Sequence, residues 1–242
     1  MIHLAAVLGV KNTESNLLNC LNINIKGTNN ILEISSRAGV EKFLFASSSE
    51  VYGEALSIPI NEDSITQGKT AYGVSKLAGE ELVKAYSQKF PNLKYSILRF
   101  FNVFGPDQVN QFVVSKFIKN ALDGKPIIIN GTGEQLRSYC YVDDAVRGMI
   151  MALKSNNANS ETINIGHQFN LISLNDLAKL VCQTVGASEE IITNDLPSRD
   201  QIAENDGKWV RKKTDWKEVL TDKDLVRFNE INSQCLDKYG YK

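Results

Sequence analysis

The sequence predicts an α/β protein with a parallel sheet in its first half and a smaller second domain after it. The first hundred residues alternate strand-like apolar runs with helix-like segments, which is the pattern of βαβ units. The alternation changes after Gly105-Pro106, where we place a soft domain boundary. The chain is 43% hydrophobic over 242 residues, and this supplies enough apolar side chains for a sizeable core.

The first half contains the clearer elements. Ile2–Ala6 is predicted to be a short apolar strand, and Ile23–Ala38 a helix whose end is marked by a glycine. A loop rich in turn residues separates the next two elements. The remaining segments are predicted as a strand, a helix and a strand: Lys42–Ser47, Tyr72–Phe90 and Leu93–Phe100.

Beyond the boundary the predicted elements are shorter and more varied. Phe112–Leu122 is an amphipathic helix, and two further helices are predicted at Val142–Lys154 and Leu174–Val185. Short strands are predicted at Pro126–Asn130 and Thr162–Ile165.

Charge and composition exclude several functional classes. A net charge of −1 gives no attraction toward nucleic acid or an anionic membrane. No apolar run reaches about 18 residues, so we expect no membrane span, and the N-terminus lacks the pattern of a signal peptide. The four cysteines form no C-x-x-C pair and only two histidines are present. We therefore expect no disulfide framework, no metal site and a reducing, cytoplasmic compartment.

A tyrosine and a lysine stand one helical turn apart in the stretch AYGVSKLAGE. Tyr72 and Lys76 share one face of the predicted helix. An unperturbed tyrosine titrates near pH ~10, and an ammonium beside it favours the phenolate. The pair is therefore a candidate acid/base couple, with two unrelated residues on a half-exposed helix as the alternative.

The polar stretch FASSSEVYGE follows the strand predicted at Lys42–Ser47. Ligands of parallel α/β sheets bind at the carboxyl ends of the strands. Because side chains alternate along a strand, Ser48 and Glu50 are expected on one side, and Ser47 and Ser49 on the other. A hydroxyl here is suited to hydrogen-bond a substrate hydroxyl, and a plain polar turn is the alternative.

Six motifs occur in a fixed order along the chain: HLAA, NIKGTNNILE, FASSSEVYG, YGVSK, LRFFNVFGP and GTGEQLRSYCYVDDA. Together they resemble the extended short-chain dehydrogenase/reductase family, in the branch of nucleotide-sugar epimerases and dehydratases to which UDP-glucose 4-epimerase belongs. The resemblance runs from Ile2 to Trp216. It implies a truncated, NAD-binding, partial Rossmann-type sheet over residues 1–108. It also implies a mainly substrate-binding domain over residues 109–242, with segments that return to the sheet.

The resemblance implies chemical roles for residues of the first half. Tyr72 would take the proton from the sugar 4-hydroxyl while NAD takes the hydride from C4. Lys76 would hold the nicotinamide ribose and lower the pKa of Tyr72, and Ser48 matches the residue that hydrogen-bonds O4. Asn24 matches an asparagine on the cofactor-proximal helix. The pair Ala5 and Ala6 would approach NAD through its backbone, although plain strand packing explains the same residues.

The resemblance leaves the reaction open. An NAD-dependent nucleotide-sugar epimerase, acting on a UDP-sugar, is the first expectation. Dehydratases of the family carry an Asp-Glu pair where this chain has Ser49-Glu50, and serine before glutamate also resembles UDP-glucuronate decarboxylases. Glu50 is thus a candidate catalytic residue or a solvated loop acid. A non-catalytic remnant that binds a nucleotide sugar is the third possibility.

Substrate contacts are implied farther along the chain. Asn102 in FFNVFGP matches a residue that binds the sugar diphosphate, and Arg137 in GEQLRSY matches an arginine that contacts the phosphates. Arg199 in LPSRDQ resembles a second such arginine. Asn130 stands where an aromatic residue usually stacks on the base, so the base stays open. Arg99 is expected to be structural, bridging a strand and a helix.

Family members carry about two βα units before HLAA, with a G-x-x-G-x-x-G loop that holds the pyrophosphate. That motif does not occur in this sequence. We expect, in this order, a fragment or misassigned start, a segment supplied by another polypeptide, or a remnant with altered activity. The helices at Asn24–Ser36 and Tyr72–Phe90 usually form a dimer interface in the family, so a homodimer is expected.

Overall fold

The computed structural model describes residues 1–9, 13, 15–54, 59–167 and 171–194. It has the predicted α/β class and a parallel sheet, which confirms the fold expected from the sequence. The chain divides into two compact units. The first comprises Met1–Phe101 and Ala145–Gly166; the second comprises Asn102–Asp144 and the described residues from His167 onward.

A four-stranded parallel sheet forms the centre of the first unit, in the order β1-β2-β3-β8. Its strands are Ile2–His3 (β1), Lys42–Ser48 (β2), Lys94–Phe100 (β3) and Glu161–Ile165 (β8). The two central strands, β2 and β3, are apolar and buried over most of their length, as expected for strands covered on both faces.

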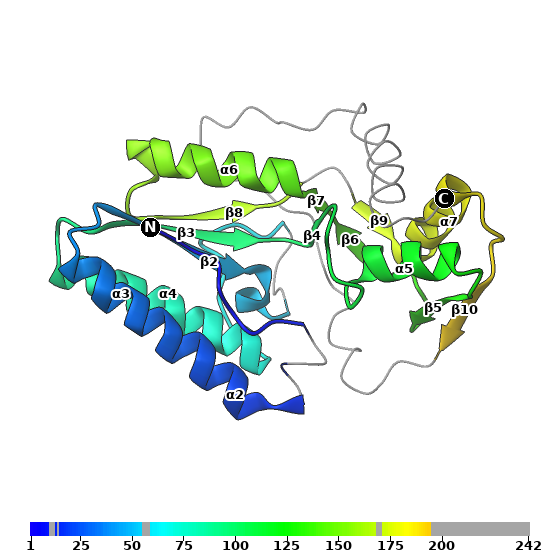
Figure 1. Cartoon of the computed structure of the whole chain (residues 1–242), viewed down its shortest axis with the longest axis horizontal. Coiled ribbons are helices and arrows are strands. Elements are labelled where there is room, and N and C mark those ends of the chain that lie inside the picture. Colours follow the sequence, from blue (N-terminus) through cyan, green and yellow to red (C-terminus); the bar gives the residue numbers. More distant parts are fainter. Residues whose placement is uncertain (10–12, 14, 55–58, 168–170, 195–242) are drawn as a thin grey trace. The chain divides into compact units, whose positions relative to one another are not determined.

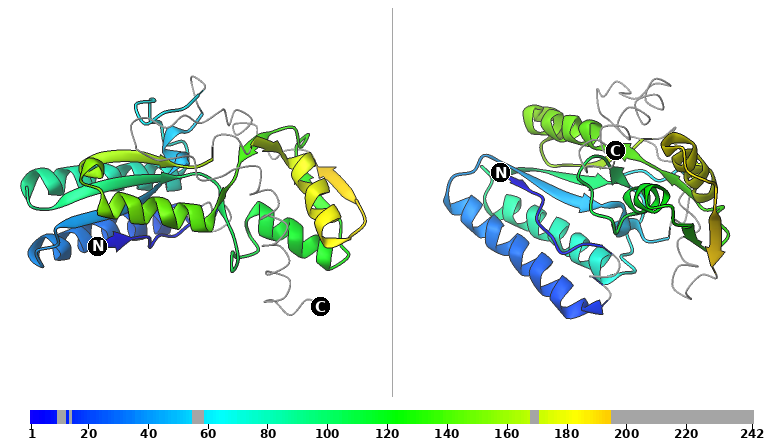
Figure 2. Two further views of the ribbon diagram at one scale, coloured as in Figure 1. Left: turned by 90° about the horizontal axis from the view of Figure 1, so that it is seen from above. Right: turned by 45° about the vertical axis from the view of Figure 1, so that its right-hand side comes forward.

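Helices cover both faces of this sheet. Figure 1 shows α3 (Gly27–Arg37) and α4 (Ala71–Lys89) on one face and α6 (Val142–Lys154) on the other, and the second view of Figure 2 agrees. The core between the sheet and the first two helices consists of buried apolar side chains: Leu32, Phe43, Phe45, Val83, Leu93 and Ile97.

The helix expected at Ile23–Ala38 is longer and less regular than predicted. It begins with α2 (Leu17–Leu21), whose first turn is capped by the side chain of Asn16, and continues through a π-helical turn at Asn22–Lys26 into α3. A π turn inside an α-helix is uncommon and occurs frequently at functional sites.

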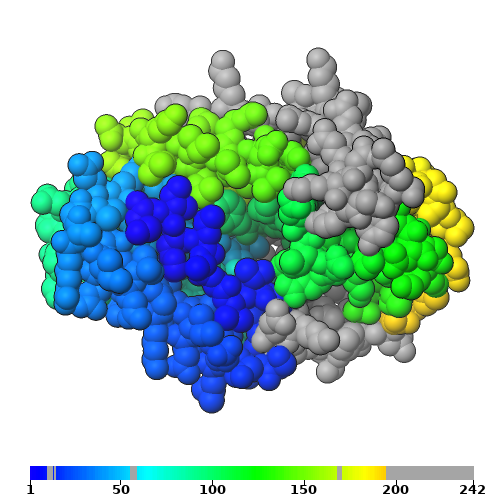
Figure 3. All heavy atoms as spheres, viewed as in Figure 1, coloured from blue at the N-terminus to red at the C-terminus, as the bar shows by residue number. Residues whose placement is uncertain are grey.

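The first predicted strand is shorter than expected. Only Ile2 and His3 pair with β2, and the residues after them form an irregular segment. Met1, Ile2 and Leu4 are exposed, and Figure 3 shows the first residues of the chain, in dark blue, at the surface.

The second unit contains two helices and several short strands. Helices α5 (Val113–Leu122) and α7 (Leu174–Val185) contact each other and surround a buried apolar cluster that includes Phe117 and Val181. The strands pair in twos: β4 (Val103–Phe104) with β7 (Cys140–Tyr141), β5 (Ile127–Asn130) with β10 (Ile191–Asn194), and β6 (Leu136–Ser138) with β9 (Leu171–Ser173).

Candidate active site

The carboxyl end of β2 leads directly into a short turn. Ser48 is the last residue of the strand, and a 3-10 helix follows at Ser49–Tyr52. The hydroxyl of Ser48 accepts a hydrogen bond from the backbone N–H of Glu50 at 3.2 Å, so it caps this helix. The turn fixes Ser48 at the edge of the sheet where parallel α/β proteins bind ligands.

Helix α4 packs closely against this turn and against β2, because a glycine of the helix lies at each of the two contacts. A Cβ on Gly73 would lie 2.7 Å from the carbonyl oxygen of Glu50, and a Cβ on Gly79 would lie 2.4 Å from the ring of Phe45. Thr70 caps the helix, since its hydroxyl accepts from the N–H of Gly73 at 2.9 Å. The first turn of α4, with Tyr72, is therefore held against Ser48 and the residues after it.

Tyr72 and Ser48 share a side-chain hydrogen bond. Burial raises the pKa of Tyr72 to about 12, the Ser48 hydrogen bond pulls that pKa downward, and the charge of Glu50 pushes it up. Glu50 is exposed, and its carboxylate accepts from the hydroxyl of Thr70 at 3.4 Å. Ser48 and Tyr72 thus lie side by side, and Glu50 is close enough for its charge to affect the pKa of Tyr72.

Lys76 lies one turn along the same face and is 4% exposed. Its Nζ donates to the carbonyl oxygen of Ala46 at 2.7 Å and lies 5.6 Å from the centre of the Tyr72 ring. Burial lowers the pKa of Lys76 to about 8. The pKa of Tyr72 therefore differs in direction from the sequence-based expectation, because burial of the phenol outweighs the influences that favour the phenolate.

Asn24 joins three segments of the first unit. Its side chain accepts from the backbone N–H of Val7 at 2.7 Å and donates to the carbonyl oxygen of Val7 at 3.0 Å. The same amide donates to the hydroxyl of Ser75 on α4 at 3.0 Å. Since Val7 follows Ala5 and Ala6 directly, Asn24 fixes the backbone of the segment in which they lie.

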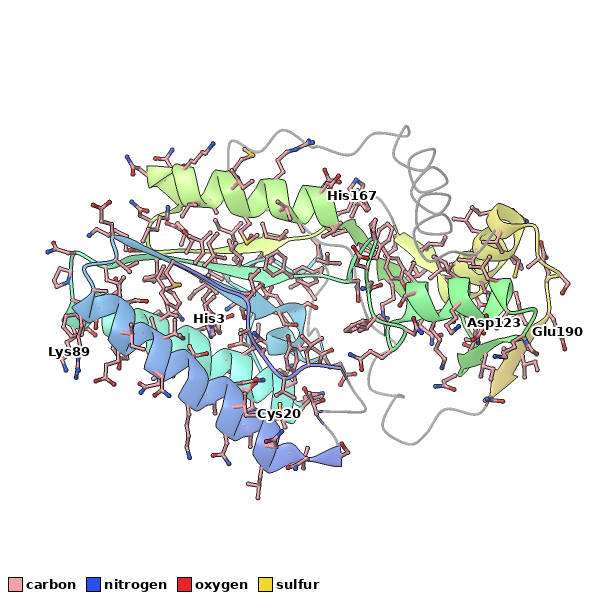
Figure 4. The ribbon with its side chains drawn as sticks, viewed as in Figure 1. His3, Cys20, Lys89, Asp123, His167 and Glu190 are labelled. Carbon is pink, nitrogen blue, oxygen red and sulfur yellow. The ribbon has the colours of Figure 1, made fainter. Side chains whose placement is uncertain are left out.

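Sequence reasoning missed the polar neighbours of Asn24. Thr28 donates to the carbonyl oxygen of Asn24 at 2.7 Å, and its hydroxyl also contacts Nε2 of His3 at 3.2 Å. Cys20 is fully buried beside the Asn24 amide, at 3.5 Å. Figure 4 labels Cys20 on α2 and His3 on the face of the sheet that α3 covers. The spacing of Cys20, Asn24 and Thr28, four residues apart each time, was the available signal.

The residues present fit one ribose of a bound dinucleotide. The ammonium of Lys76 makes one side-chain hydrogen bond among the described residues, although it has three donors. A buried cationic donor of this kind suits the hydroxyl groups of a ribose. Across the described part of the chain, no group of three or more His, Cys, Asp or Glu side chains is arranged to hold a metal ion.

The predicted substrate residues of the second unit lie near one another. Asn102 has a φ of 36°, a strained value for a residue other than glycine, and its amide donates to the carbonyl oxygen of Ser138 at 3.0 Å. Ser138 follows Arg137, whose guanidinium donates to the carbonyl oxygen of Leu136 at 3.0 Å. Arg199 lies outside the described residues.

The architecture is that of known Rossmann-like enzymes. The structure of a UDP-glucose 4-epimerase from Thermotoga maritima with UDP-glucose superimposes with a TM-score of 0.88 at 28% identity, covering 98% of this chain and 77% of that one. A UDP-glucuronic acid 4-epimerase from Bacillus cereus, in complex with UDP-glucuronic acid and NAD, gives 0.83 at 29% identity, covering 98% and 76%.

Residues 1–166 match the sequence model of the NAD dependent epimerase/dehydratase family, and the chain belongs to that family. A UDP-N-acetyl-alpha-D-glucosaminuronate decarboxylase of Bacillus cytotoxicus is 34% identical over 200 residues, which is 79% of this chain and 61% of that protein. A UDP-glucuronate 4-epimerase of Thermodesulfobacterium geofontis is 35% identical over 187 residues, 77% and 57%. The chain spans about half to two thirds of the length of the curated relatives it matches.

No helix in the described part of the structure combines the length and the apolar character needed to cross a membrane.

Proposed function

We propose that the chain is part of an NAD-dependent nucleotide-sugar 4-epimerase that acts on a UDP-sugar. The observation that carries this proposal is the hydrogen-bonded pair of Ser48 and Tyr72, with the buried ammonium of Lys76 one turn along the same helix. Epimerases among the relatives and solved structures support it.

In this proposal the chain's own residues bind the sugar and move one proton. Ser48 hydrogen-bonds the sugar 4-oxygen, and Tyr72 accepts the proton of that hydroxyl and later returns it. Because the pKa of Tyr72 is about 12, the phenol is protonated at neutral pH, and the tyrosine acts as a base only when a further positive charge comes near. When bound, NAD supplies that charge and accepts the hydride.

The other residues hold the ligands. Lys76 binds the ribose of the cofactor, and Asn24 keeps the backbone of Ala5 and Ala6 in place beside it. In the second unit, Asn102 and Arg137 bind the diphosphate, and Arg199 is proposed for the same task. Arginine suits it because its planar donors match two phosphate oxygens at once.

The test is interconversion of UDP-sugars. The chain, and the longer protein if its gene encodes further residues in frame, is incubated with NAD and with UDP-glucose, UDP-galactose or their N-acetyl forms. We expect interconversion that falls by at least about a hundredfold in Tyr72→Phe, because general acid–base catalysis contributes roughly 100- to 10,000-fold. Absence of interconversion from the longer protein, with all sugars, would refute the epimerase.

A second function, decarboxylation or 4,6-dehydration, is supported by Glu50. Its carboxylate is exposed at the site and close enough to raise the pKa of Tyr72, and a decarboxylase is among the relatives. Release of carbon dioxide from a UDP-uronic acid, or of a 4-keto-6-deoxy sugar, would favour this function. A third candidate, a non-catalytic remnant, predicts that calorimetry detects no NAD binding; a micromolar affinity contradicts it.

We also propose that the chain forms a homodimer through α3 and α4. Ile34 on α3 and Val74 on α4 are 59% and 44% exposed, which is high for large apolar side chains on adjacent helices. Light scattering coupled to size-exclusion chromatography measures the mass directly. Substitution Ile34→Glu should give a monomer, and a wild-type chain that is already monomeric at micromolar concentration would refute the dimer.

A further inference from the structure

A buried ion pair joins β3 to α4, the helix that carries Tyr72 and Lys76, and is not itself part of the candidate site. The guanidinium of Arg99 on β3 binds the carboxylate of Glu80 on α4 in bidentate fashion, with Nε to Oε1 at 2.9 Å and Nη2 to Oε2 at 2.7 Å. Their side chains are 5% and 0% exposed. The sequence-based expectation that Arg99 bridges a strand and a helix is thereby confirmed.

The pair also holds two other segments. Oε1 of Glu80 accepts a hydrogen bond from the hydroxyl of Ser47 on β2. Nη1 of Arg99 donates to the hydroxyl of Tyr52 at 2.8 Å, and that hydroxyl donates to the side-chain oxygen of Asn164 at 2.7 Å. Two strands, a helix and the 3-10 turn therefore meet at one charged centre. We call Ser47, Tyr52, Glu80 and Arg99 the lock.

Each member of the lock that lies outside β3 stands beside a residue of the candidate site. Ser47 precedes Ser48, and Tyr52 ends the 3-10 turn that Ser48 caps. Glu80 lies one turn beyond Lys76 on α4, at a spacing of four residues, so these two side chains are neighbours on one face of the helix.

Stability alone gives no reason for such a pair. Removing two charges from water costs more than their attraction usually returns, and apolar residues of similar volume are often as stable. The directional hydrogen bonds, however, fix the positions of the groups they join, which apolar contacts do less strictly. The lock therefore adds directional polar contacts that tie α4 to β2 and β3.

We infer that Glu80 and Arg99 are positioning residues that set the separation between the hydroxyls of Ser48 and Tyr72. This inference rests on the proposed function, because it concerns the placement of the two hydroxyls proposed to act on the sugar. One of its two tests nevertheless needs no enzymatic activity. Neither residue touches the substrate or the cofactor in this reading.

The first test replaces the charged centre with apolar groups. The triple variant Ser47→Ala/Glu80→Leu/Arg99→Met removes both charges and the hydroxyl that would lose its partner. We expect it to remain folded by circular dichroism, with kcat reduced about a hundredfold and KM nearly unchanged, since a misplacement of about 1 Å has that effect. A folded triple variant with wild-type kcat would overturn the inference.

Two further variants make this test specific. Arg99→Lys keeps the charge but loses the bidentate geometry, so it should remain folded and show the same loss of kcat. If the triple variant does not fold, Arg99→Lys takes its place as the test, and a wild-type kcat in Arg99→Lys would then overturn the inference. The matched control removes the exposed pair of Glu33 and Arg37 on α3 and should leave kcat unchanged.

The second test needs no activity. 3,5-Difluorotyrosine is placed at position 72, where its fluorines lower the titration range of the phenol toward neutral pH, and its pKa is read by ¹⁹F NMR. With the lock intact, Ser48→Ala should raise this pKa by about half a unit or more, because a bond to the charged form is lost. In the Arg99→Lys background the same substitution should have little effect. Equal shifts in both backgrounds would refute the positioning role, whether or not the enzyme is an epimerase.

Discussion

Lys76→Met tests whether the ammonium at the candidate site is desolvated. Burial lowers the pKa of Lys76 from 10.5 to about 8 in the folded chain. Because one pKa unit corresponds to about 1.4 kcal/mol, keeping the amine charged at neutral pH costs the fold about 3 kcal/mol. The unfolded chain holds its proton up to pH 10.5 whereas the folded chain releases it above about pH 8, so this cost disappears as the pH rises through that window.

The expected result is a difference that depends on pH. We measure the free energy of unfolding of the wild type and of Lys76→Met by urea titration at each pH. Between pH ~7 and pH ~10.5, the wild type should gain about 3 kcal/mol of this free energy relative to the variant. The same substitution at Lys84, whose side chain on α4 is 40% exposed, is the control for the loss of a lysine from the surface of this helix. A difference for Lys76→Met that does not change with pH would show that its amine is hydrated and that the argument from burial is wrong.

Three further predictions concern the packing and protonation of the first unit. Gly79→Ala should destabilise the chain by roughly 1–3 kcal/mol in urea unfolding, because its Cβ would overlap an aromatic ring, whereas Gly27→Ala, with nothing within 4 Å, should stabilise it by up to about 1 kcal/mol. Asn24→Ala should cost about 2 kcal/mol of unfolding free energy and speed hydrogen exchange of the Val7 amide, and unchanged exchange would show that the Asn24 side chain does not hold that amide. Since the pKa of Tyr72 is raised to about 12, the wild type should lose stability relative to Tyr72→Phe as the pH rises from about 10 to 12, and a flat difference would contradict its burial.

Much of the fold was predictable because its elements carry strong local signals. The helices at Val142–Lys154 and Leu174–Val185 have the predicted bounds, since their apolar periodicity and ends are clear. The π turn at Asn22–Lys26 was not predictable, because no local residue pattern separates it from an α-helix. The strand predicted at Ile2–Ala6 is shorter in the structure, because only Ile2 and His3 pair with β2.

That Ser48, Tyr72 and Lys76 lie close together could be predicted from the sequence, whereas the direction of the pKa shift of Tyr72 could not. The spacing of Tyr72 and Lys76 places them on one helix face, and the structure has them there. The pKa of the tyrosine depends on how deeply the helix is buried, which the spacing does not reveal. Glu80 continues the same spacing, but its pairing with Arg99 links residues on separate elements, and only the folded chain shows it.

The π turn at Asn22–Lys26 has a consequence for the number of residues in this helix. A π turn holds one residue more per hydrogen-bonded ring than an α turn. Deleting a single residue within Asn22–Lys26 should close this turn into a regular α-helix and leave the helical turns on either side in nearly the same register. The π turn is therefore the place where the helix that runs from α2 into α3 can lose one residue at little structural cost, whereas a deletion in its regular turns would rotate one part of the helix against the other by about 100°.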